Sequence, residues 1–175
     1  EGDLAVGDAL EPLVGEGDTV DVAGEIARRM IAAADRLHVH GPPLVPDGGI
    51  DRVIEPWTAR GYRVAFRVTC KETSDGQTFA TPEWVMRKGA KGAFFEHGRV
   101  SRAWEPDYGD PIFLDCLDRF HAAFAERYDA KPWLEYVDIG SYGDWGEGHT
   151  VPSSKRAWPV DVIRRHVEIH RRHYQ

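Results

Sequence analysis

Residues 133–150 of the chain read WLEYVDIGSYGDWGEGHT, and they join two different local patterns. From residue 134 to residue 139 the side chains alternate between two faces, which predicts a β-strand. One face carries Leu134, Tyr136 and Asp138, and the other carries Glu135, Val137 and Ile139. Four glycines follow at 140, 143, 146 and 148, and among them are Asp144, Trp145, Glu147 and His149. Because each glycine costs folding entropy that simpler turns avoid, this composition favours a functional loop, with a polar structural loop as the alternative.

The whole chain has the composition of one globular domain, or of a piece of a larger one. Its 175 residues are 42% hydrophobic and 29% charged, which is enough to bury a core. The net charge of -7 argues against nucleic acid as the main partner, because phosphate binding needs a basic face. The arginines near the C-terminal end are interpreted as a solvated helix face; they are Arg164, Arg165, Arg171 and Arg172.

The sequence gives no indication of a membrane partner or of a disulfide framework. No apolar run approaches the roughly 20 residues that a membrane span needs. The chain begins at Glu1 without a methionine, which indicates a processed protein or an excised fragment. Cys70 and Cys116 are expected to be core thiols, with a single disulfide as the alternative. The compartment stays open, with a secreted or periplasmic location as the preferred expectation.

The first half of the chain alternates helical and extended patterns. Residues 1–20 carry no sustained period and are expected to be irregular. Asp21 is a candidate cap for a helix that runs to Leu37, and residues 37–41 alternate like a short strand. A second helical face spans residues 50–57 despite Pro56, and residues 62–70 predict a strand. Near the end of that strand, Arg67 either meets a carboxylate or ligand, or reaches solvent.

The second half contains the clearest helix. The long connection at residues 71–110 is predicted to hold a short helix at 82–87 and a short strand at 93–95, and a connection of this length is usually functional or contains further elements. Asp110 and Pro111 predict the start of a helix that ends near Tyr128. A last helix begins at Pro159, and its predicted buried face carries Val160, Ile163, Val167, His170 and Tyr174.

This order of elements predicts an α/β fold of parallel β/α units, as a single domain over residues 1–175. Parallel neighbouring strands need crossover connections, and helices between strands supply them. In such folds the active residues gather at the C-terminal ends of the strands. Arg67 and the cluster at residues 144–149 both follow or end a predicted strand. These residues are therefore the candidate site.

Glu147 is the candidate general acid of this site. Trp145 and Trp158 are close to it in sequence, and an apolar aromatic environment keeps a carboxylic acid protonated, as proton donation at neutral pH requires. Hydrolysis of a glycosidic bond also needs a second carboxyl group roughly 5 to 9 Å away. Asp138 and Asp144 are close in sequence, but the second carboxyl group more often comes from another strand. The sequence has no Gly-x-Ser-x-Gly elbow and no phosphate-binding glycine motif.

Three segments together carry a family resemblance: YVDIGSYGDWGE at 136–147, RGYRVAFR at 60–67 and YGDP at 108–111. They resemble the first half of a (β/α)8-barrel glycoside hydrolase of clan A, nearest to the family 42 β-galactosidase-like group, over about residues 50–175. The resemblance implies that Glu147 is the acid/base at the end of the fourth strand and that Arg67 supports the nucleophile. It implies a carbohydrate substrate, with neither cofactor nor metal. Sugar contacts are expected from Trp104, Tyr108, Asp144, Trp145 and His149.

The chain departs from this family pattern in two places. Clan members usually carry Asn directly before the acid/base, and this chain carries Gly146. The chain also ends soon after the expected fourth strand, whereas a full barrel typically needs about 250 residues. We therefore expect a half-barrel, a fragment of a larger barrel, that pairs with itself or with its missing C-terminal half.

Two further functions stay open. A carbohydrate-binding or scaffold protein would retain the barrel without catalysis, and Gly146 motivates this alternative. A metal-dependent hydrolase would use histidines and carboxylates from the set His38, His40, His149, Asp138 and Asp144. The histidines at 166, 170 and 173 have a metal-compatible spacing, but they lack the glutamate of a metalloprotease motif and are not the preferred metal site.

Overall fold

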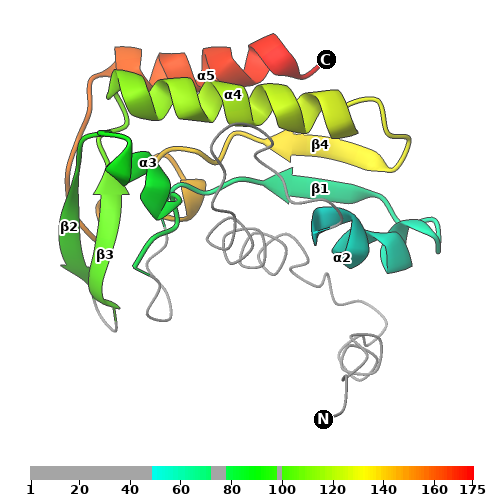
Figure 1. Ribbon diagram of the computed structural model, residues 1–175, viewed down its shortest axis with the longest axis horizontal. Helices are drawn as coiled ribbons and strands as arrows, with labels where there is room; N and C mark the ends of the chain where they lie inside the picture. Colours follow the sequence, from blue (N-terminus) through cyan, green and yellow to red (C-terminus); the bar gives the residue numbers. More distant parts are fainter. Residues whose placement is uncertain (1–48, 72–77, 98–99) are drawn as a thin grey trace.

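The computed structural model describes residues 49–71, 78–97 and 100–175 (Figure 1). The irregular segment expected at 1–20, the helix expected at 21–37 and the strand expected at 37–41 lie outside these residues. The elements in chain order are α2 (Gly49–Thr58), β1 (Val64–Arg67), α3 (Glu83–Arg87), β2 (Gly92–His97), β3 (Val100–Pro106), α4 (Pro111–Tyr128), β4 (Leu134–Asp138), the 3-10 turn η2 (Asp144–Gly146) and α5 (Val160–His173).

The strands form two small sheets. β1 and β4 pair in parallel, with α4 in the connection between them, while β2 and β3 form an antiparallel hairpin. The prediction of an α/β fold with parallel pairing is confirmed at this level. Within the described ranges the parallel sheet has two strands, so a barrel is not seen there.

The pairing of β1 with β4 contains a bulge that changes which side chains face the core. Val64 pairs with Leu134 but Ala65 pairs with Tyr136, so Glu135 is an extra residue in β4. Leu134 and Val137 therefore both pack against the same core cluster, and Tyr136 is 60% exposed. The simple alternation predicted for residues 134–139 is wrong in this respect, because one inserted residue reverses the faces beyond it.

One core cluster lies between the parallel sheet and its helices. Val64 and Phe66 are buried on one face of β1, and Phe66 meets Phe124 of α4 edge to face at 5.0 Å between ring centroids. Ile50 and Ile54 of α2 and Tyr128 of α4 complete the buried cluster. Helices α4 and α5 run side by side over the strands (Figure 1). Burial of these apolar side chains holds β1 and β4 in place, and with them the strand ends at Arg67 and Asp138.

A second core cluster lies under the connection that follows β1. Trp104 of β3 packs there with residues of α4, α5 and the glycine-rich loop, among them Phe113, Tyr142 and Ile169. The predicted short helix and the predicted strand around 93–95 are confirmed as α3 and β2. Strand β3 is an addition, and alternation fails to reveal it because residues 103–106 are all buried.

Helix α4 begins as predicted. The Asp110 carboxylate accepts hydrogen bonds from the backbone N–H groups of Ile112 and Phe113 at 2.9 and 3.0 Å. The last helix is confirmed, and the predicted face is inward in part. His170 is buried and Ile163 packs on a core cluster as expected, but Val160 is 67% exposed. His166 and Ile169 are buried in addition.

The structure bears on two expectations from the sequence, namely that the two cysteines are core thiols and that the chain has no membrane-spanning run. Cys70 and Cys116 are free buried thiols, as expected, and burial raises the pKa of Cys70 to about 12. Among residues 49–71, 78–97 and 100–175, no helix combines the length and apolar character that a bilayer crossing requires.

Candidate functional site

Arg67 and Asp138 join the ends of the two parallel strands. They are register partners, and Arg67 Nε donates to Asp138 Oδ2 at 2.6 Å while its second guanidinium nitrogen contacts the same oxygen. Their side chains are 44% and 35% exposed. Arg67 therefore does both things that the sequence left open, since it meets a carboxylate and still reaches solvent. Asp138 is engaged by this pair.

The glycine-rich loop folds back on these strand ends. A Cβ placed on Gly140 would lie 2.5 Å from Cγ of Arg67, and a Cβ on Gly146 would lie 2.3 Å from the carbonyl oxygen of Gly140. Gly146 also has φ +77°, which disfavours any L side chain. The loop is closed by hydrogen bonds from Asp144 N to His149 O at 2.7 Å and from Gly148 N to Tyr142 O at 3.0 Å. The glycines thus permit a compact loop stacked on Arg67.

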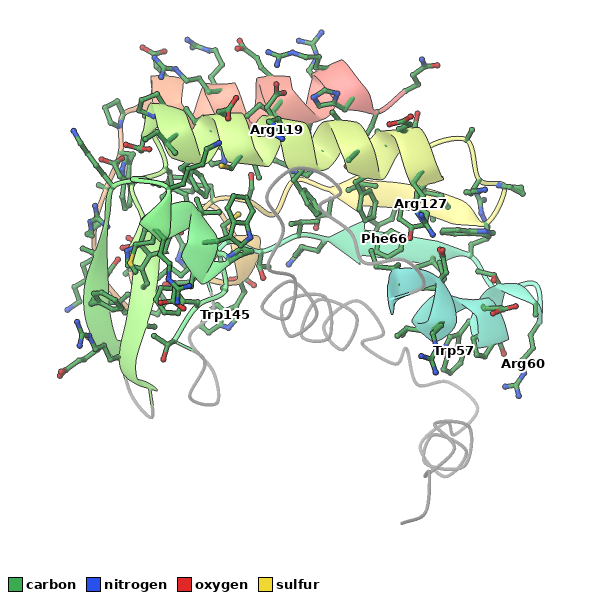
Figure 2. All side chains as sticks on the ribbon, in the orientation of Figure 1. Trp57, Arg60, Phe66, Arg119, Arg127 and Trp145 are labelled. Carbon is green, nitrogen blue, oxygen red and sulfur yellow. The ribbon has the colours of Figure 1, made fainter. Side chains whose placement is uncertain are left out.

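Trp145 has a strained backbone in this loop. Its φ of 52° and ψ of 15° place it in the left-handed region, which bulky residues rarely occupy. Its side chain is half-buried, and in the view of Figure 2 it lies below the level of β1, whereas α4 and α5 lie above it. Such outliers gather at binding sites because the surrounding structure must hold them.

Glu147 and His149 form an open polar pair. Glu147 Oε2 lies 3.5 Å from His149 Nε2, and their side chains are 51% and 42% exposed. The apolar enclosure expected around Glu147 from Trp158 is not observed in the part of the chain that the structure describes. Trp158 instead packs on Tyr108 with 4.8 Å between ring centroids, and its indole N–H donates to Asp107 at 2.8 Å.

A buried network of charges lies behind the loop, and sequence reasoning missed it. Lys71, Glu105 and Asp144 each have fully buried side chains. Lys71 Nζ lies 2.7 Å from Glu105 Oε1 and 2.8 Å from Asp144 Oδ1, and Arg156 lies 3.3 Å from Glu105 Oε2. Two positive and two negative groups balance one another. In the sequence, Lys71 directly follows the strand predicted at residues 62–70, and this position by itself predicts a solvated side chain.

Three expected sugar contacts are corrected by their burial. Trp104 is 3% exposed, and Tyr108 and Asp144 are fully buried. Trp104 and Tyr108 belong to the second core cluster, and burial, followed by the nearby Glu105 carboxylate, raises the pKa of Tyr108 well above its ordinary range. Asp144 is occupied by Lys71. Of the five expected sugar-contacting residues, Trp145 and His149 keep partly exposed side chains beside Glu147.

Buried histidines connect the loop to helices α4 and α5. His166 Nε2 donates to the carbonyl of Tyr108 at 3.0 Å, and its Nδ1 is hydrogen-bonded to the Ser141 hydroxyl at 2.7 Å. Burial lowers the pKa of His166, which favours the neutral ring, in which Nδ1 accepts from Ser141. His121 and His170 meet edge to face with ring centroids 4.4 Å apart. Burial first, and then the neighbouring His170, lower the pKa of His121 to about 3.

The sequence also left a metal-dependent hydrolase open, which would need a cluster of histidines and carboxylates. No group of three or more His, Cys, Asp or Glu side chains in residues 49–71, 78–97 and 100–175 has an arrangement that could hold a metal ion. His38 and His40 lie outside these residues.

No protein-family model, no curated protein and no solved structure matches this chain.

Proposed function

We propose that this chain is the first half of a (β/α)8-barrel glycoside hydrolase, in which Glu147 donates a proton to the leaving oxygen of an O-glycosidic bond. Arg67 orients the nucleophilic carboxylate, which the second half of the barrel contributes. Trp145 and His149 contact the sugar. The substrate is a carbohydrate, and the reaction uses no cofactor.

The meeting of Arg67 with the glycine-rich loop at one edge of the parallel sheet carries this proposal. β1 and β4 end side by side, and Gly140 and Gly146 allow the loop to stack on the stem of Arg67. Glu147 follows directly with an exposed carboxylate. Barrel enzymes carry their catalytic groups at this edge, on the loops after neighbouring parallel strands.

The placement of the helices also supports the proposal. α2 and α4 pack on the face of the strands that carries Val64 and Phe66, and α5 runs beside α4 (Figure 1). A barrel has its helices on the outer face only, whereas a doubly wound sheet has helices on both faces. The opposite face carries the exposed Tyr136, and in a barrel this face would point inward.

The first test is Glu147→Gln in the full-length protein, assayed on a panel of oligosaccharides and alkyl glycosides, whose leaving oxygen must be protonated. Loss of the proton donor should lower kcat by about 10²- to 10⁴-fold, the usual contribution of general acid catalysis. The melting temperature should stay nearly unchanged, because Glu147 is exposed and makes one long contact. Glu126→Gln on the exposed side of α4 is the matched control and should retain activity. Unchanged turnover in Glu147→Gln would remove Glu147 from the mechanism.

A second function, sugar binding without catalysis, is favoured by the surroundings of Gly146. The Cβ clash with the Gly140 carbonyl leaves no room for the Asn that precedes the acid/base in clan members. The residue that would grip the sugar there is thus excluded by the loop itself. Isothermal titration with oligosaccharides discriminates the two functions, since binding with no turnover supports the second and turnover rejects it.

A further inference from the structure

Lys71 is a fully buried lysine with three polar partners. Its ammonium donates to Glu105 Oε1 at 2.7 Å and to Ser154 Oγ at 3.0 Å, and it forms an ion pair with Asp144 Oδ1 at 2.8 Å. The ammonium also lies 4.4 Å from the centre of the Phe95 ring. A lysine normally keeps its charge in water, so burial requires this complete set of partners.

The partners of Lys71 come from segments that are far apart in the sequence. Glu105 belongs to β3, Asp144 begins the 3-10 turn in the glycine-rich loop, and Ser154 belongs to the turn after it. Ser153, from that same turn, donates to Asp144 Oδ1 at 2.5 Å. Lys71 is therefore the point at which the hairpin, the loop and the following turn are joined.

Asp144 connects this network to the candidate acid. Its carbonyl oxygen accepts the Glu147 N–H at 2.9 Å, and its own N–H donates to the His149 carbonyl at 2.7 Å. The backbone of Asp144 thus holds the two exposed residues of the site. Its side chain is held in turn by Lys71 and Ser153.

The charges of the network balance without a ligand, because Lys71 and Arg156 offset Glu105 and Asp144. The buried Asp144 Oδ2 has no hydrogen-bond partner among the described residues, so Asp144 is held through Oδ1. Buried ion pairs add little net stability compared with apolar residues of similar shape, but their hydrogen bonds are directional. We infer that Lys71 is a positioning residue, which holds the loop through Asp144 and thereby places Glu147. This role rests on the proposed function of Glu147.

The test is residue-resolved amide hydrogen exchange on Lys71→Met. The reporters are the bonded amides of Asp144, Glu147 and Gly148, and the amides of α4 serve as the reference for global opening. If Lys71 holds the loop, the loop amides should exchange at least about tenfold faster while those of α4 stay within about threefold. Lys88→Met, at a lysine that is 42% exposed, is the matched control and should leave both sets unchanged.

Two results would overturn the inference: equal acceleration in the loop and in α4, which indicates general stabilisation, or no acceleration in the loop. If Lys71→Met does not fold, Ser153→Ala decides instead, because it removes one hydrogen bond to Asp144. The same local acceleration, of smaller size, is expected there, and unchanged loop amides would reject the role.

Activity on methyl β-D-galactopyranoside, whose leaving oxygen must be protonated, separates this inference from the proposed function. In the full-length protein, Lys71→Met should lower kcat with little change in KM, because the acid is displaced and the sugar contacts remain. Full activity in Glu147→Gln would reject the proposed function while the exchange data still decide whether Lys71 holds the loop. Full activity in Lys71→Met together with an inactive Glu147→Gln would reject the positioning role alone.

Discussion

Gly146 and Gly148 separate two reasons for glycine in the loop. Both have φ +77°, so both occupy the left-handed region. A Cβ on Gly146 would collide with the backbone of Gly140, whereas a Cβ on Gly148 would meet nothing within 4 Å. Glycine is therefore needed at 146 both because a Cβ has no room and because φ is positive, whereas at 148 it is needed only because φ is positive.

Gly146→Ala and Gly148→Ala should differ in stability for this reason. Left-handed backbone costs an L-residue roughly 1 to 2 kcal/mol, so Gly148→Ala should lose about that much. Gly146→Ala adds a backbone collision and should lose at least about 2 kcal/mol more. Urea unfolding of both variants measures the difference in unfolding free energy. Equal losses would show that the backbone of the loop can shift to accommodate a Cβ at residue 146.

The α4–α5 pair is held by histidines as well as by apolar side chains. His121 of α4 meets His170 of α5 edge to face, and its Nδ1 is hydrogen-bonded to the Tyr174 hydroxyl at 2.8 Å. His173 lies 2.8 Å from Asp118 of α4. Burial lowers the pKa of His121, His166 and His170, and for His170 it outweighs the opposing effect of the nearby Asp138 carboxylate. Acid should therefore weaken the contact between the two helices.

The sign of this pH dependence follows from His121. Its pKa falls from 6.5 in the unfolded chain to about 3 in the folded chain, so its stabilising effect is complete above pH 6.5 and is lost as the pH falls toward 3. Between pH 6.5 and pH 3, His121 contributes a slope of up to about 1.4 kcal/mol per pH unit to the free energy of unfolding. His121→Asn keeps an acceptor or donor near Tyr174 but cannot titrate.

Urea unfolding at several pH values tests His121→Asn. The variant should show a shallower decrease of unfolding free energy between pH 6.5 and pH 3 than the parent chain. Glu168→Gln on the exposed side of α5 is the control and should follow the parent curve. Parallel curves for His121→Asn and the parent would exclude His121 as a source of the acid sensitivity.

At the scale of the whole molecule, the face of the parallel sheet opposite the core cluster carries an aromatic side chain in solvent. Tyr136 of β4 is 60% exposed there, and Ile139, which directly follows the strand, is 43% exposed. A soluble domain usually covers such side chains when they lie on a central sheet. This exposure is consistent with the expectation that the chain pairs with itself or with a further part of its own protein.

Tyr136→Lys should weaken that association if this face is the contact. Size-exclusion chromatography with light scattering over a range of concentrations should show a lower mass for the variant than for the parent chain. Tyr62→Lys is the matched control, because Tyr62 is 56% exposed but lies beside Trp57, before β1. A monomeric parent chain, or an equal effect of both variants, would contradict the expectation.

The sequence predicted the features that depend on neighbouring residues. Asp110 and Pro111 mark the start of α4 because capping is settled within one turn, and the glycines mark the loop because left-handed backbone is a local demand. The placement of Arg67 beside the loop also followed, since parallel strands bring their ends together.

The remaining features depend on contacts distant in sequence. The bulge at Glu135 reverses the faces of β4, and alternation alone gives no sign of it. Lys71 resembles any lysine after a strand until β3 brings Glu105 to it. The burial of His166 in α5 was missed because this polar residue finds its partners in Ser141 and Tyr108.

The position of Glu105 has a consequence for how this protein can evolve. The hairpin occupies a connection that is only 2 to 6 residues long in many β/α units, which makes it look like a replaceable insertion. Yet it supplies one of the two carboxylates that meet Lys71, and its deletion would leave that lysine short of a partner in the interior. The hairpin and the glycine-rich loop should therefore be retained or lost together in evolution. A chimaera that carries one without the other should not fold stably.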